Sequence, residues 1–66
     1  MELVADKATA MQTLVGIRES GMETFSVAEM ARALGKNIET MHRELESLVG
    51  HGQLCRVGKK YARVRV

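Results

Sequence analysis

An apolar stripe with helical spacing runs along the first third of the chain. Its members recur at intervals of three and four residues: they are Val4, Ala8, Met11 and Val15, with Leu14 and Ile17 widening the stripe. This is the spacing of one face of an α-helix, and Gly21 follows where a left-handed residue closes such helices. The pattern predicts a helix over residues 5–20, weakened by about 1 kcal/mol at Gly16 relative to alanine. Thr24-Phe25, a β-branched and an aromatic residue, is expected to form a brief strand.

A capping signal opens a second, shorter helix. Ser26 and Glu29 stand three residues apart, so each side chain can bind the backbone N–H group of the other. Apolar residues with helical spacing follow, at Val27, Met30, Ala31 and Leu34. Gly35 then interrupts the pattern. The sequence therefore predicts a helix over residues 27–34.

The clearest helical period lies in residues 38–49. Asn37 is a favourable N-cap for this segment, and Gly50-His51-Gly52 ends it. The predicted inner side consists of Ile38, Met41, Leu45, Leu48 and Val49. The side chains predicted to point away from it are Lys36, Glu39, Thr40, Arg43 and Ser47, with Asn37 and His42 on the flanks. We therefore expect a third helix with an apolar inner side and an exposed polar side.

Two strand-like segments follow, over residues 53–57 and 60–66. They flank Gly58-Lys59, and a short glycine-containing link between two such segments is typical of a β-hairpin. In the second segment, three apolar residues alternate with three others: Ala62, Val64 and Val66 against Tyr61, Arg63 and Arg65. This alternation predicts one apolar face and one basic face.

The order of these elements predicts an α+β fold in one domain, residues 1–66. Three segments also match the motifs of a known family in order and spacing. SVAEMARALG (26–35) matches S/T-V-x-E-L-A-x-x-L-x, TMHRELESL (40–48) is close to T-I-R-R-D-L-x-x-L, and GQLCR (52–56) matches G-x-L-x-R. Residues 26–61 thus resemble the winged helix-turn-helix family, most closely the N-terminal DNA-binding domain of DeoR-type bacterial repressors. The resemblance implies a three-helix domain with a C-terminal β-hairpin wing.

Positive charge is concentrated near the carboxyl end. Residues 1–50 hold five basic and eight acidic residues, a net charge of −3. Residues 51–66 hold five basic and no acidic residues, a net charge of +5. Such an asymmetry indicates a polyanionic partner, and a solvated, solubilising tail is the alternative.

The family resemblance implies that the partner is double-stranded DNA and that the protein regulates transcription. The third helix is then expected in the major groove and the hairpin on the backbone. Arg43, opposite the apolar side, has the fork geometry that recognises guanine, and the start of a helix favours phosphate. The candidate DNA-contacting residues are Lys36, Asn37, Thr40, His42, Arg43, Ser47, Arg56, Lys59, Lys60 and Arg63. One such domain buries only about 600–1,000 Å² on DNA, so we expect a homodimer or a partner protein.

Composition argues against several other classes of protein. A chain of 66 residues is too small for a large catalytic cavity, and 3% aromatic residues are too few to stack on single strands. His42, His51 and Cys55 lack the spacing of a zinc site, and no set of nucleophile, base and acid is apparent. We expect no enzymatic activity, no metal and no cofactor. No apolar run has the length of a membrane span or reads as a signal peptide, so we expect a cytoplasmic protein without membrane contact.

Three alternatives stay open. Arg43 can pair with Glu39 or Glu46 on its own helix. The acidic residues of that helix also fit a winged-helix module that docks on another protein and binds no DNA. Recognition of structured RNA or of an unusual duplex by the same helix and hairpin is the third alternative.

Overall fold

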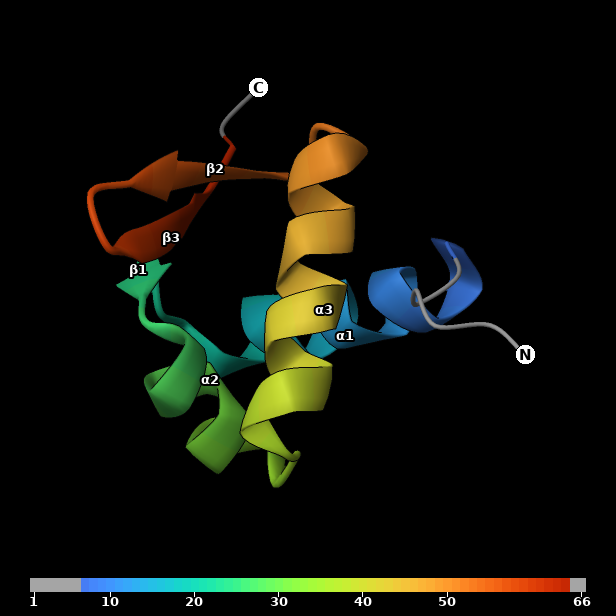
Figure 1. Cartoon of the computed structure of the whole chain (residues 1–66), viewed down its shortest axis with the longest axis vertical. Coiled ribbons are helices and arrows are strands. Elements are labelled where there is room, and N and C mark those ends of the chain that lie inside the picture. The colour runs from blue at the N-terminus through green and yellow to red at the C-terminus, as the bar shows by residue number, and fades with distance from the viewer. Residues whose placement is uncertain (1–6, 65–66) are drawn as a thin grey trace.

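The computed structural model describes residues 7–64 and shows three helices and a three-stranded antiparallel sheet (Figure 1). The elements are α1 (Lys7–Ser20), β1 (Thr24–Phe25), α2 (Val27–Leu34), α3 (Ile38–Gly50), β2 (Leu54–Val57) and β3 (Lys60–Arg63). The α+β fold class predicted from the sequence is therefore confirmed. In Figure 1, α3 runs in front of α1, and α2 and the sheet both lie to its left. It packs against α1, α2 and β2 and so forms the centre of the domain.

Local hydrogen bonds set the start and end of the central helices as predicted. The Ser26 hydroxyl accepts from the N–H of Glu29 (3.1 Å), and the Glu29 carboxylate accepts from the N–H of Ser26 (2.8 Å). Gly35, with φ of 67°, closes α2 in the left-handed conformation, which glycine adopts at little cost. The side-chain oxygen of Asn37 then accepts from the N–H groups of Glu39 and Thr40 and begins α3.

Every helix and strand contributes to one hydrophobic core. Its buried members are Ala10, Leu14, Ile17, Phe25, Met30, Ala31, Met41, Leu45, Leu48, Leu54 and Tyr61. The rings of Phe25 and Tyr61 stack with their centroids 6.5 Å apart, which joins the sheet to this core. No helix within residues 7–64 has the length and hydrophobicity needed to cross a bilayer.

The predicted inner stripe of α1 was correct in part. Leu14 and Ile17 are buried and Met11 packs against the core, but Val15 is 47% exposed. Ala10 and Thr13, which were not predicted, also face the core. Val4 and the side chain of Ala8 lie outside the described part. Thr13 turns inward because α3 and the turn before it supply polar partners for its hydroxyl.

Gly16 lies where α1 approaches α2 closely. A Cβ atom at this position would stand 3.0 Å from Cδ2 of Leu34. The glycine that weakens the helix in isolation therefore allows the two helices to pack.

The predicted inner side of α3 also needs correction. Ile38 is 59% exposed, whereas Glu44 is only 4% exposed. Ile38 stands at the first turn of the helix, beyond the edge of the core. Glu44 takes a place in the inner row because a cation reaches its carboxylate there.

The sheet has the order β1-β3-β2, with Phe25 opposite Tyr61 and Arg56 opposite Tyr61. The hairpin was predicted correctly, but the apolar face predicted for its second strand is not the more buried one. Tyr61 is buried and Arg63 shares its side, whereas Ala62 is only half-buried and Val64 is exposed. The face of Tyr61 turns inward because its ring stacks on Phe25. Arg65 and Val66 lie outside the described residues.

Candidate nucleic-acid interface

The hairpin turn (Gly58-Lys59) and α3 lie on the same side of the molecule. A shallow groove separates them, which we call the α3–hairpin groove. It is lined by Val27, His42, Glu46, Arg56, Gly58, Lys59, Lys60 and Tyr61. In Figure 1 the turn is at the far left, and α3 stands beside it with α1 behind. The helix and the hairpin therefore form one composite surface.

Glu46 fixes the hairpin to α3. Its carboxylate accepts two hydrogen bonds from the fork of Arg56 and one from the hydroxyl of Tyr61. His42, one turn earlier on α3, stands 3.9 Å from the same carboxylate. Sequence reasoning considered Glu46 only as a partner for Arg43 and missed this role, because the contact joins residues ten and fifteen positions apart.

Arg43 is left available on the outer side of α3, which we define by Glu39, His42 and Arg43. These residues line a second shallow hollow together with Glu46 and Ser47. Arg43 is exposed and forms no ion pair within residues 7–64. The predicted alternative, a pair of Arg43 with Glu39 or Glu46, is therefore not present, and Glu46 binds Arg56 instead.

The two lysines of the hairpin differ in their surroundings. Lys59 forms no ion pair in the described part of the chain, whereas Lys60 stands 3.7 Å from the carboxylate of Glu29 in α2. The pKa of Glu29 is lowered, chiefly by the backbone hydrogen bond from Ser26 and then by the charge of Lys60. The hairpin turn is thereby linked electrostatically to the start of α2.

Lys36 does not lie on the outer side of α3, contrary to the prediction. Its ammonium group donates to the carboxylate of Glu44 (2.7 Å) and to the hydroxyl of Thr13 (2.8 Å). Thr13 also donates to Glu44. The lysine turns inward because Glu44 is buried and needs a countercharge.

Four further candidates are less available than the sequence suggested. Arg63 is half-buried at the opposite end of β3 from the hairpin turn and lines a different hollow. Thr40 and Ser47 are half-buried, and Ser47 borders the hollow of Arg43. Asn37 is exposed, but its side-chain oxygen is engaged as the N-cap. The structure therefore brings together six of the ten candidates: His42, Arg43, Ser47, Arg56, Lys59 and Lys60.

Residues 7–64 contain no group of three or more histidine, cysteine or acidic side chains placed to hold a metal ion. The chain matches no protein-family model, no curated protein and no solved structure. The function of the composite surface is therefore inferred from its own geometry and charge.

Proposed function

We propose that the protein is a winged helix-turn-helix that binds double-stranded DNA and regulates transcription. In this proposal α2 and α3 are the helix-turn-helix pair, and β2 and β3 form the wing. The outer side of α3 enters the major groove, which is about 12 Å wide and admits one helix. The hairpin turn then lies on the neighbouring phosphates. The resemblance to DeoR-type domains points the same way.

The observation that carries this proposal is the shared orientation of α3 and the hairpin. Both border the α3–hairpin groove, so a duplex placed on the outer side of α3 also meets Lys59. Glu46 holds the hairpin against the helix through Arg56. A surface that is ordered in this way before binding loses less conformational freedom when it meets the duplex.

Two cations have distinct roles on this surface. Arg43 is exposed without an ion pair in the described chain, and its planar fork can donate two hydrogen bonds to guanine. Lys59 is a point charge on the hairpin turn and suits a phosphate contact. Arg43 thus supplies sequence preference and Lys59 supplies affinity without preference.

The proposal is tested by fluorescence anisotropy with duplexes selected from a random library. The affinity of the unaltered protein should fall steeply as salt rises. Arg43→Ala should weaken binding to the selected sequence about tenfold and change binding to random duplex much less. Lys59→Ala should weaken binding to both and reduce the salt slope by about 1.

The matched control is Lys7→Ala. It also removes one positive charge, but at the start of α1, at the far end of the molecule from the hairpin turn (Figure 1). Its affinity for the selected duplex should stay close to that of the unaltered protein. Absence of binding to any duplex at low salt would reject the proposal, and so would equal losses in Lys7→Ala and Lys59→Ala.

A protein-docking module is the second candidate function. Two of the hairpin cations, Arg56 and Lys60, already face the carboxylates of Glu46 and Glu29. Glu39 adds an exposed negative charge to the outer side of α3. These contacts lower the net positive charge of the surface and favour a partner that is less acidic than DNA. The anisotropy experiment separates the two candidates, because a docking module shows no salt-dependent binding to duplex.

A further inference from the structure

A hollow at the other end of the sheet gathers two arginines that have no ion-pair partner among residues 7–64. We call it the arginine hollow; its volume is about 220 Å³. It is lined by Leu14 and Arg18 of α1, Gln53 before β2, and Arg63 and Val64 at the end of β3. None of these residues lines the α3–hairpin groove or the hollow beside Arg43. It is therefore a separate feature from the proposed DNA surface.

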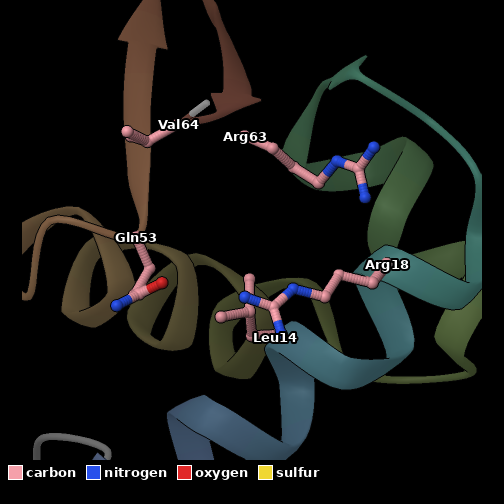
Figure 2. A pocket seen from close by; sticks show the side chains of 5 residues that line it. All are labelled: Leu14, Arg18, Gln53, Arg63 and Val64. Atoms are coloured by element: carbon pink, nitrogen blue, oxygen red, sulfur yellow. The ribbon is translucent and has the colours of Figure 1, made fainter. Parts of the chain in front are cut away.

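Figure 2 shows how the two arginines frame the opening. Arg63 extends from the end of β3 along one rim, and Arg18 extends from α1 along the opposite rim. In this view Leu14 lies at the guanidinium group of Arg18, and Gln53 and Val64 lie on the remaining side. The two guanidinium groups thus come from segments 45 residues apart in the sequence, which only the fold brings together.

Among the described residues, the charge that lines the hollow is entirely positive. Neither Arg18 nor Arg63 forms an ion pair with any residue in the range 7–64, and no acidic side chain lines the opening. Two like charges on facing rims repel each other, and an anion placed between them removes that repulsion. Two cations elsewhere in this fold, Lys36 and Arg56, each have a carboxylate partner.

We propose that the arginine hollow binds the phosphate group of a small organic phosphate. Guanidinium forks donate pairs of parallel hydrogen bonds to phosphate oxygens, and two forks match the double charge of a phosphate monoester. Val64 is 43% exposed and its methyl groups offer an apolar surface to the organic part of the ligand, while the buried Leu14 forms the floor of the hollow. This site does not depend on DNA binding and stands whether or not the proposed function holds.

The test is a titration followed by NMR in a chloride buffer free of phosphate. Phenyl phosphate, inorganic phosphate and benzoate are added separately. The readouts are the side-chain Nε–H resonances of Arg18 and Arg63 and the methyl resonances of Leu14 and Val64. Phenyl phosphate should shift all four sets and saturate. Inorganic phosphate should shift the arginine resonances, and benzoate, with a single charge, should bind more weakly than phenyl phosphate.

Variants show whether the shifts arise in the hollow. Arg18→Ala and Arg63→Ala should each weaken phenyl phosphate binding about tenfold, the loss expected for a charge-assisted pair. Arg18→Lys keeps the charge without the fork and should lose less than Arg18→Ala. Arg32→Ala removes an exposed guanidinium on α2, which does not line the hollow, and should bind like the unaltered protein.

Each outcome of the titration either supports or overturns the proposed phosphate site. Saturable binding that is lost in Arg18→Ala and Arg63→Ala but kept in Arg32→Ala supports the site. Equal affinity of phenyl phosphate and inorganic phosphate still supports it and identifies free phosphate as a sufficient ligand. Equal affinity of benzoate would overturn the assignment to phosphate, and unsaturable shifts or equal losses in all three alanine variants would overturn the site itself.

Discussion

Glu44 and Glu46 lie two residues apart on α3, and each carboxylate is held by a cation from another part of the chain. Glu44 points inward, where its side chain is 5% exposed, and binds Lys36 and the hydroxyl of Thr13. The side chain of Glu46 is 29% exposed and faces the hairpin, where it binds Arg56. The same side-chain chemistry on the same helix thus serves two different neighbours.

The difference lies in what each contact holds and what its loss costs. A buried carboxylate is stable only while it is paired, so removing one partner from such a pair is strongly destabilising. A contact near the surface is weakened by solvent, and its loss costs little. The inner contact of Glu44 therefore secures α3 in the body of the domain. The outer contact of Glu46 sets the position and charge of the hairpin at a small cost in stability.

The sharpest test of this comparison is Glu44→Ala. The substitution leaves the buried hydroxyl of Thr13 without its acceptor and Lys36 without its countercharge. Because Lys36 is about one-third exposed, it can turn its ammonium group to water and recover part of the loss. The free energy of unfolding should fall by about 2–4 kcal/mol, measured by urea denaturation. Glu39→Ala, an exposed glutamate on the same helix, should change it by less than about 1 kcal/mol, and equal losses would break the comparison.

The second test is Glu46→Ala, which should affect the hairpin more than the domain. The fork of Arg56 and the hydroxyl of Tyr61 lose their acceptor. The free energy of unfolding should fall by only about 1 kcal/mol. The amide protons of β2 and β3 should exchange faster with solvent, while those of α1 keep their protection.

If the protein binds DNA as proposed, two variants of this contact should change the affinity for duplex in opposite directions. Glu46→Ala removes a negative charge and releases the guanidinium of Arg56, so affinity for duplex should rise a few-fold. Arg56→Ala loosens the same contact but removes the cation, so affinity should fall. If both variants change affinity in the same direction, order in the hairpin outweighs its charge. If neither speeds amide exchange in the hairpin, Glu46 does not hold it.

The features that sequence reasoning predicted correctly depend on neighbours in the chain. The capping box of Ser26 and Glu29, the closing Gly35 and the N-cap Asn37 each act on backbone groups within four residues. Such local bonds are encoded in a few adjacent positions. These local signals predicted the boundaries of α2 and α3. The hairpin turn was likewise predicted from a local signal, Gly58.

The predictions that were wrong concern residues whose partners are distant in the sequence and meet them only in the folded chain. Hydropathy placed Ile38 on the inner side of α3 and left Glu44 out of it, because a carboxylate is assumed to seek water. Glu44 is buried through its contacts with Lys36 and Thr13, which lie 8 and 31 positions away. Tyr61 was assigned to the basic face of the hairpin, because its partners stand on β1 and α3 and cannot be recognised within the hairpin itself. The convergence of α3 and the hairpin on one surface follows from this tertiary arrangement and not from either segment alone.

A third carboxylate, Glu29, extends the comparison to a fully exposed contact. Its pKa lies below the ordinary value of 4.5, first because the backbone N–H of Ser26 donates to it and then because of the charge of Lys60. A group whose pKa is lower in the folded protein stabilises the fold above its ordinary pKa and loses this effect as pH falls through the folded value.

The substitution Glu29→Gln gives the smallest expected effect. Glutamine keeps an oxygen that accepts from the N–H of Ser26 but carries no charge toward Lys60. At pH 7 the variant should unfold at a slightly lower urea concentration than the unaltered protein. The difference should close as pH falls from 4.5 through the folded pKa of Glu29, because both side chains are then neutral. Unfolding curves recorded from pH 7 to pH 3 measure this convergence. A difference that persists at the acid end would mean that the shape of the side chain, and not its charge, joins the start of α2 to the hairpin.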